Sequence, residues 1–286
     1  MLADFLEFDF LRNTFLTGLL IGVIAPLLGT FIVVRRLSLI ADALSHVTLA
    51  GIAFGLFVEK KFAITFITPL YSGMFFSVMG SIFIEKLRSV YKSYQEIAIP
   101  IILSGGVGLS VIFIALADGF NTELFNYLFG SVSAVSRNDF LSILGISVFI
   151  AIIITLFYKE LFTLSFDEEH ARVSGIHAKR IHFLFIVLTA LVIAASIRIV
   201  GVLLVSALMT LPVAASMRLA KGFKQMMLLS IVFGELAVII GLITGYYLSI
   251  PPGGTIVMVS IIILLLSISL KRFRYRTIKV RDNNEH

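Results

Sequence analysis

The stretch that decides the fold runs from residue 37 to residue 56 and reads LSLIADALSHVTLAGIAFGL. It is apolar enough to cross a bilayer as a helix, yet it carries Asp42 and His46, which are four residues apart and therefore share one helix face. A charged side chain at the centre of a membrane helix costs about 2.5 to 3.5 kcal/mol, so such residues usually line a pathway or bind a ligand. We therefore predict a functional site at these two residues. The structural alternative is an ion pair between Asp42 and Arg35 or Arg36 at the membrane edge.

The composition is that of a polytopic membrane protein. Of the 286 residues, 59% are hydrophobic and 14% are charged, against about 25% charged in a soluble domain. Long apolar runs in lipid must be helices, because the backbone has to satisfy its own hydrogen bonds, and these runs are too long and do not alternate as barrel strands do. We expect an all-α helix bundle forming one domain over residues 1–286. Since basic residues here reflect topology, the formal charge of +6 does not indicate nucleic-acid binding.

The residue types available restrict the chemistry of any metal site. The chain has no cysteine, so such a site must be built from histidine and carboxylate oxygen. Glu235 is a further candidate, because it lies about ten residues inside an apolar run near mid-bilayer. It is either a second ligand or relay, or a protonated packing residue.

The pattern of apolar runs predicts nine membrane crossings, with eight as the first alternative. The difference lies in residues 183–217, which form either one long crossing or a pair that turns at Arg198. The pair leaves most of the 23 Lys and Arg residues inside, which places the N-terminus outside and the C-terminus in the cytoplasm. Residues 118–139 are expected to form a short interfacial or re-entrant helix. The expected crossings are 13–34, 37–59, 62–84, 97–117, 140–158, 183–197, 199–217, 226–248 and 253–270.

Small residues four apart within these runs predict close helix packing. A cluster of glycines at 105, 106 and 108 also indicates either packing or an irregular stretch. The expected packing pairs are Gly18 with Gly22, Gly51 with Gly55, and Gly241 with Gly245.

Four stretches, in order along nearly the whole chain, resemble the permease subunits of the bacterial ABC importers for zinc, manganese and iron(II). They are RRLSLIADALSHVTLAGIAFG, YLFGSVSAV, SFDEEHARVSGI and VGVLLVSALMTLPVAAS. The resemblance implies a multi-pass protein of the bacterial cytoplasmic membrane that works as a homodimer, with a cytoplasmic ATP-binding subunit and an extracellular metal-binding protein. The sequence contains no GxxxxGK[ST] phosphate loop, so the chain is expected to be a transport subunit rather than an ATPase.

The family's metal motif, D-x-x-x-H, falls on Asp42 and His46. Two subunits facing across a two-fold axis would supply two carboxylates and two imidazoles, which suit a tetrahedral zinc and also accept manganese or iron(II) with added water. Ser45, Val47 and Thr48 resemble the zinc permeases more than the manganese ones, so zinc is the expected cargo and manganese or iron(II) the alternative. No permanently bound cofactor is expected.

The loop at residues 159–182 resembles the cytoplasmic coupling segment of ABC importers, whose pattern is Glu-Ala-Ala, three residues, then Gly. Glu169, Ala171 and Gly175 match this pattern, whereas His170 replaces the middle alanine and the downstream leucine-proline is missing. The resemblance implies a short helix that seats in a groove of the ATPase and transmits its closure.

Other basic segments have simpler interpretations. His170, His177 and His182 lie among Lys and Arg and are expected on a solvated docking surface. The tail at 271–286 is expected to be cytoplasmic and to contact anionic lipid.

Two rival functions use the same pair of residues. An intramembrane metalloenzyme would need further ligands and a general base, and the sequence has no HExxH motif. A passive metal channel would need no ATPase, and the coupling-like loop argues against it.

Overall fold

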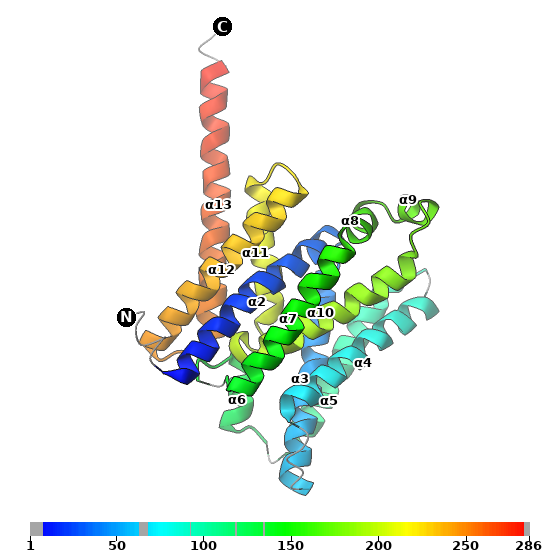
Figure 1. Ribbon diagram of the computed structural model, residues 1–286, viewed down its shortest axis with the longest axis vertical. Coiled ribbons are helices and arrows are strands. Elements are labelled where there is room, and N and C mark those ends of the chain that lie inside the picture. The colour runs from blue at the N-terminus through cyan, green and yellow to red at the C-terminus, as the bar shows by residue number, and fades with distance from the viewer. Residues whose placement is uncertain (1–7, 63–67, 92, 118, 134, 283–286) are drawn as a thin grey trace.

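The computed structural model describes residues 8–62, 68–91, 93–117, 119–133 and 135–282, with side chains described as far as residue 272. Within these ranges the chain consists of helices joined by short turns and contains no strand, so the predicted all-α class is confirmed (Figure 1). The helices are α2 (Asp9–Val34), α3 (Ser38–Phe62), α4 (Pro69–Val90), the 3-10 helix η1 (Gln95–Ile97), α5 (Ala98–Leu116), α6 (Thr122–Phe129), α7 (Arg137–Leu156), α8 (Tyr158–Phe166), α9 (Glu168–Val173), α10 (Ala178–Val200), α11 (Val205–Leu219), α12 (Phe223–Leu248) and α13 (Pro252–Asp282).

Seven stretches of the described chain are long and apolar enough to cross a membrane. They are α2, α3, η1 with α5, α7, α10, α12 and the first part of α13 (Pro252–Arg272). Two further helices coincide with expected crossings: α4, which is 22 residues long and ends among charged residues, and the shorter apolar α11 of 15 residues. The prediction of a polytopic helix bundle is therefore confirmed.

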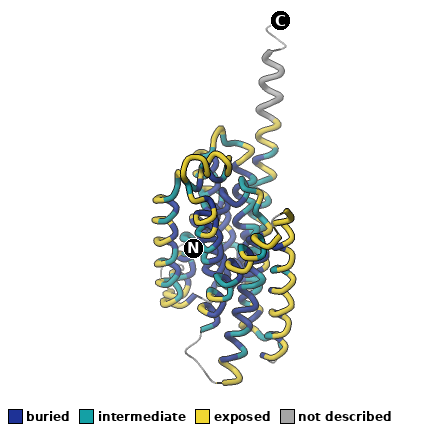
Figure 2. Tube along the Cα trace, turned by 90° about the vertical axis from the view of Figure 1, so that its right-hand side faces the viewer, coloured by how far each residue is buried: buried dark blue, intermediate teal, exposed yellow. Residues whose placement is uncertain are grey.

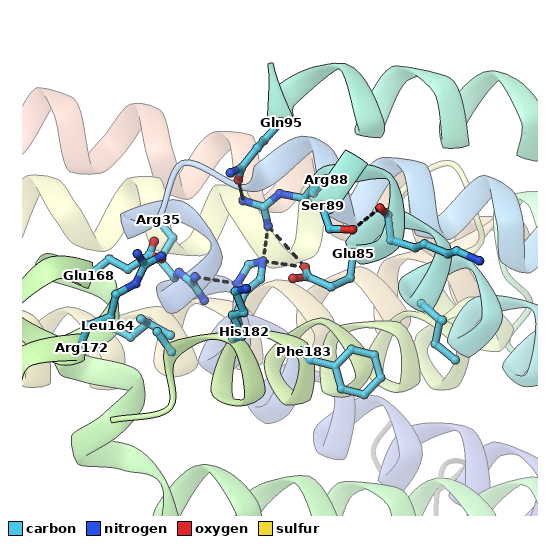
Figure 3. Close-up of a pocket in the computed structure, with 14 residues that line it drawn as sticks. Arg35, Glu85, Arg88, Ser89, Gln95, Leu164, Glu168, Arg172, His182 and Phe183 are labelled. Carbon is cyan, nitrogen blue, oxygen red and sulfur yellow. Dashed lines mark hydrogen bonds and ion pairs between the residues drawn. The ribbon is translucent and has the colours of Figure 1, made fainter. Parts of the chain in front are cut away.

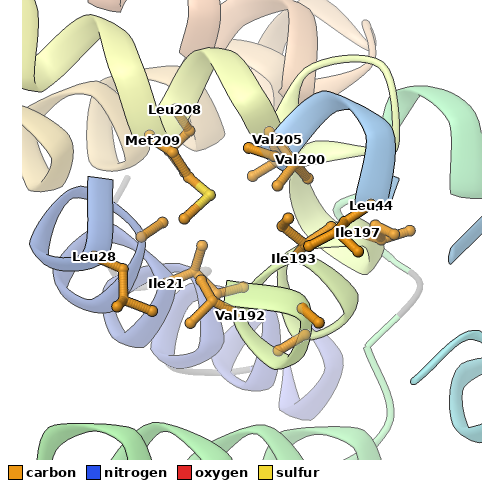
Figure 4. Close-up of a cluster of buried hydrophobic side chains, with 14 of the residues drawn as sticks. Ile21, Leu28, Leu44, Val192, Ile193, Ile197, Val200, Val205, Leu208 and Met209 are labelled. Carbon is orange, nitrogen blue, oxygen red and sulfur yellow. The ribbon is translucent and has the colours of Figure 1, made fainter. Parts of the chain in front are cut away.

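Helices α2, α3 and α10 are the most buried of the candidate membrane spans. Figure 2 shows that the buried segments, in dark blue, lie inside a layer of exposed ones, in yellow. In the most apolar window of α3 and of α10, 72% of the residues are buried, against 22% for α7. Figure 4 shows the side chains that fill the buried interior, among them Ile21 and Leu28 from α2, Leu44 from α3, Ile193 from α10 and Met209 from α11. The helix that carries Asp42 and His46 is thus held from several sides.

Residues 183–217 form two helices, as predicted, but the first helix ends at a turn three residues later than the charge pattern indicates. Helix α10 continues past Arg198 to Val200, and Gly201, with a φ of 84°, donates its N–H to the carbonyl of Ile197. A φ in this range favours glycine, so the turn lies at Gly201 and not at Arg198.

Residues 119–133 contain the short helix that the sequence predicts, α6. Asn121 caps its start by accepting a hydrogen bond from the Leu124 N–H at 2.7 Å. Its end is locked to the turn between α10 and α11: Val202 N–H donates to the Tyr127 carbonyl at 2.9 Å. A Cβ added at Gly130 would lie 1.9 Å from the Ile199 carbonyl oxygen, so only glycine fits there. Residues 118 and 134 of the predicted segment lie outside the described residues.

The predicted polar interruption at 159–182 contains α8, α9 and the start of α10. Asp167 caps α9 by accepting from the His170 N–H at 2.8 Å. Figure 1 shows α9 at the end of the bundle toward which α13 extends. Helix α13 continues through the first part of the predicted tail to Asp282. The last four residues of that tail, 283–286, lie outside the described residues.

Candidate metal site

A tight turn between α2 and α3 sets the position of Asp42 and His46. Arg36 N–H donates to the Val33 carbonyl, and Leu37 N–H donates to the Ile32 carbonyl at 2.9 Å, which lets α3 begin directly at Ser38. Asp42 therefore lies one turn into α3, and His46 lies one turn further along the same face.

Asp42 is partly exposed and contacts a hydroxyl of α11. Ser206 Oγ lies 3.4 Å from Asp42 Oδ1, and Thr210 Oγ1 donates to the Ser206 carbonyl at 2.9 Å. In the part of the chain that the structure describes, Asp42 forms no ion pair. Arg35, its expected alternative partner, is turned toward His182 instead, at 2.6 Å. The carboxylate therefore remains available for a ligand.

His46 is also partly exposed, and its backbone rather than its ring is held. Ser110 Oγ of α5 donates to the His46 carbonyl at 3.2 Å. Gly106 lets α5 approach closely, because a Cβ there would lie 2.9 Å from the Val47 nitrogen. Among the described residues, the imidazole has no hydrogen-bond partner. Both ring nitrogens are thus unused in one subunit.

One subunit supplies too few donors for a complete metal site. Among the described residues, no three His, Asp or Glu side chains converge. Asp42, His46 and Ser206 offer one carboxylate, one imidazole and one hydroxyl, whereas zinc takes about four ligands and manganese about six. The arrangement can hold a divalent ion only with water or with groups from another chain.

Glu235 is not brought together with the other two candidates. Its carboxylate lies against α2, where a Cβ added at Gly22 would be 2.9 Å from Glu235 Oε1. No Cα atom of α12 lies within 8 Å of a Cα atom of α3. The structure therefore separates Glu235 from Asp42 within one subunit.

The six glycines expected at helix contacts all lie where a Cβ would crowd a neighbour. Closest is Gly55, where a Cβ would be 2.3 Å from Ser72 Oγ, followed by Gly241 at 2.4 Å from Ile256 Cγ1. Gly18, Gly22, Gly51 and Gly245 would meet an atom of another part of the chain at 2.7, 2.9, 2.6 and 3.1 Å.

The residues of the coupling-like loop lie on and after α9. Glu169 is exposed, Ala171 is fully buried, and Gly175 ends the turn after α9 with a φ of 82°. A Cβ at Gly175 would meet open space, so the backbone conformation and not crowding accounts for glycine there.

The expectation of a solvated His182 is wrong. Its relative exposure is 8%, and its ring lies between Arg35 and Arg88. His170 and His177, in contrast, are exposed as expected.

Ser206 and Thr210 on α11 were not among the predicted site residues. They lie four residues apart in the apolar stretch VGVLLVSALMTLPVAAS, which is the same spacing that drew attention to Asp42 and His46. This pair of hydroxyl residues, four apart in an apolar stretch, was the feature of the sequence that could have indicated a polar face on α11.

Comparison with known proteins identifies the family. The model of the ABC 3 transport family matches residues 7–271. The chain belongs to this family. The ABC 3 assignment confirms the predicted resemblance to the permease subunits of metal ABC importers, and the chain is a multi-pass protein of the cell membrane.

Individual relatives match this ABC 3 chain over almost its full length. A probable metal transport system membrane protein of Treponema pallidum is 37% identical over 93% of this chain and 97% of its own. The manganese import system permease protein ScaB of Streptococcus gordonii is 34% identical over 98% and 100%. The manganese transport system membrane protein MntC of Listeria monocytogenes is 29% identical over 93% and 92%.

Solved structures match the fold as well. PsaBC from Streptococcus pneumoniae in complex with Fab superimposes with a TM-score of 0.80 at 31% identity, over 93% of this chain and 95% of that one. An inward-facing metal-chelate type ABC transporter superimposes with a TM-score of 0.69 at 18% identity, which supports the fold alone.

Proposed function

We propose that this chain is the permease subunit of a manganese importer and that Asp42 and His46 contact the ion as it passes. The observation that carries the choice of metal is the identity of the relatives, because several nearly full-length ones are named as manganese import or manganese transport proteins. These relatives are not named for zinc, the metal favoured by the residues around His46. Manganese therefore replaces zinc as the preferred cargo.

The chemistry of the donor set is compatible with this choice. Oxygen donors and water suit manganese, whereas imidazole is also a good ligand for zinc and iron. Asp42 and Ser206 contribute oxygen donors beside the single imidazole of His46. A site with more oxygen than nitrogen, completed by water, favours a hard octahedral ion.

A second copy of the chain would complete the site. Asp42 and His46 are partly exposed, and one subunit brings no third acidic or histidine ligand to them among the described residues. On the adjacent α5, a Cβ at Gly105 or Gly108 would meet open space, so these glycines are not needed for packing within one subunit. A partner helix against that face would use them and would carry its own aspartate and histidine.

We propose nine crossings, with α4 and α11 spanning in addition to the seven longer apolar stretches. The last turns of α13 and helix α9 lie at one end of the bundle, and the start of α2 lies at the other (Figure 1). Since positively charged segments stay in the cytoplasm, the C-terminus is inside and the N-terminus is outside.

Energy for transport would come from a separate ATP-binding subunit that contacts α9. Glu169 is exposed for such a contact, and the buried Ala171 anchors the short helix to the bundle. An extracellular metal-binding protein would deliver the ion to the opposite end. Glu235 is left out of the metal site because it faces α2.

The test is uptake of radiolabelled manganese, zinc and iron(II) in a strain lacking this gene and its redundant importers. The wild-type chain should restore manganese uptake, whereas Asp42→Asn and His46→Ala should not. Asp9→Asn, an exposed aspartate at the start of α2, is the matched control for Asp42→Asn and should behave as wild type. Restoration of zinc but not manganese would overturn the choice of metal, and normal uptake by both site variants would overturn the site.

A further inference from the structure

A pocket of about 560 Å³ opens at the end of the bundle where α9 lies. Its walls come from the turn between α2 and α3, the last turns of α4, helix α9 and the first turns of α10 (Figure 3). The pocket is distinct from the candidate metal site, because neither Asp42 nor His46 lines it.

The lining is rich in positive charge. Five cationic side chains face two carboxylates, and the fixed charge is therefore unbalanced. The cations are Arg35, Lys86, Arg88, Arg172 and Lys179, and the carboxylates are Glu85 and Glu168. Both carboxylates already have cationic partners: Glu85 lies 3.8 Å from Arg88, and Glu168 pairs with Arg172 on the exposed rim.

His182 lies at the floor of the pocket between two guanidinium groups (Figure 3). Arg35 Nη2 lies 2.6 Å from its Nδ1, and Arg88 Nη1 contacts its Nε2. A neutral imidazole has one N–H and one acceptor nitrogen, so it can accept from only one of these arginines. The other guanidinium faces an N–H. The one carboxylate beside this ring is that of Glu85, whose Oε2 lies 3.4 Å from His182 Nε2, so two guanidinium groups share a single fixed negative charge here.

Among the described residues, Arg35 itself lacks a carboxylate partner. It forms no ion pair with a carboxylate anywhere in the described ranges, and its Nη1 is shielded from solvent without an acceptor. Burial, together with the nearby Arg88, lowers the pKa of Arg35 to about 10, which leaves it charged at neutral pH. A half-buried guanidinium in this setting would be stabilised by an anion.

We propose that this pocket binds a phosphate group, with Arg35 on its floor and Lys179 on its rim as the principal contacts. Arginine forks match the oxygens of phosphate, and a lysine supplies a further point charge. Basic pockets between membrane helices at the cytoplasmic face bind the head groups of anionic lipids. The same chemistry fits free inorganic phosphate, and the two sources are separated by experiment.

A phosphate bound in this pocket would connect two elements that are distant in the sequence. Arg35 belongs to the turn that precedes α3, and His182 belongs to the first turns of α10, at the end of the coupling-like segment 159–182. A phosphate bound between them would neutralise the repulsion between Arg35 and Arg88 and hold these two elements together.

The experiment uses the full-length chain without added metal, so its outcome is independent of the manganese assignment. In nanodiscs of phosphatidylcholine, binding of radiolabelled inorganic phosphate is measured directly. In nanodiscs that also contain phosphatidylglycerol and cardiolipin, native mass spectrometry records which lipid the released protein retains. Saturable phosphate binding identifies the free anion as ligand, and selective retention of an anionic lipid identifies the head group; either supports the proposal.

The variants are Arg35→Gln and Lys179→Gln, with Arg36→Gln as the matched control. Arg36 is the neighbouring exposed arginine and does not line the pocket. Loss of a charged hydrogen bond should weaken binding by about tenfold in the first two variants and leave the control at the wild-type level. If Arg35→Gln does not fold, the exposed Lys179→Gln decides. Absence of binding to wild type, or undiminished binding to Lys179→Gln and any folded Arg35→Gln, overturns the proposal.

Discussion

Ser206 Oγ lies 3.4 Å from Asp42 Oδ1 and thereby joins α11 to the helix that carries the proposed metal ligands. The contact is longer than a strong hydrogen bond, so the carboxylate is oriented without being neutralised. A hydrogen bond of this length can break or shift when an ion binds to the carboxylate. It also links the turn at Gly201 to the site, because α11 begins immediately after that turn.

Removing the Ser206 hydroxyl should weaken the site without destroying it. We expect Ser206→Ala to raise the apparent KM for manganese several-fold at nearly unchanged maximal rate, because one hydrogen bond is worth about 0.5 to 1.5 kcal/mol. Initial rates of radiolabelled uptake across a manganese titration measure this change. Ser269→Ala, which removes an exposed hydroxyl on α13, serves as the control. An unchanged KM would show that Ser206 does not act on the ion.

Replacing Glu235 should leave transport intact. The carboxylate faces Gly22 on α2, and its helix does not approach α3. We expect Glu235→Gln to retain wild-type manganese uptake under conditions in which Asp42→Asn has none. A loss of uptake by a stably expressed Glu235→Gln protein would show that Glu235 takes part in metal transport.

The contact between α2 and α11 should be intolerant of any side chain at residue 29. A Cβ added at Gly29 would lie 1.9 Å from the Met209 carbonyl oxygen. We expect Gly29→Ala to lower the free energy of unfolding by about 1 to 3 kcal/mol, as overpacking does. Thermal unfolding of the purified protein in detergent measures the change. Gly145→Ala on α7, where a Cβ meets open space, should be neutral or stabilising; equal stability of the two variants would contradict the prediction.

Substitution at Gly175 should separate ATP hydrolysis from transport. The residue has a φ of 82°, and side chains other than glycine strain that backbone by about 1 to 2 kcal/mol. We expect Gly175→Arg to disturb the segment after α9, so that the reconstituted complex hydrolyses ATP without importing manganese. Parallel measurement of both activities is the check, with the neighbouring exposed Ser174→Arg as control. If the Gly175→Arg complex imports manganese in proportion to the ATP it hydrolyses, as the wild type does, the segment after α9 does not couple the two activities.

Local features of the sequence were sufficient to predict the helices and the face shared by Asp42 and His46, because helix periodicity depends only on near neighbours. Contacts between distant parts of the chain were not predictable in this way. Ser206 lies 164 residues from Asp42, and no spacing rule relates them. The partial exposure of the pair likewise follows from the packing of α5 and α11.

His182 illustrates how local composition misleads. Its sequence neighbours Lys179 and Arg180 are exposed and indicate a solvated surface. Its actual contacts are Arg35 and Arg88, which lie 147 and 94 residues away. The predicted position of the turn between α10 and α11 was also wrong, by three residues. A charged residue such as Arg198 indicates only roughly where a helix ends, whereas the backbone conformation of Gly201 determines it.

The locked junction between α6 and the turn after α10 limits where the protein can be labelled. Gly130 and Gly201 lie so close to opposing backbone that even a Cβ would lie 1.9 Å and 2.4 Å, respectively, from a carbonyl oxygen, so we expect an insertion at either position to disrupt the junction. Both glycines lie in loops, but an epitope tag at either one would disrupt the fold, so its accessibility would not describe the native protein. Gly222 is exposed between α11 and α12, and a Cβ there would meet open space, so we expect it to accept such a tag and to be the better place from which to map the two sides of the membrane.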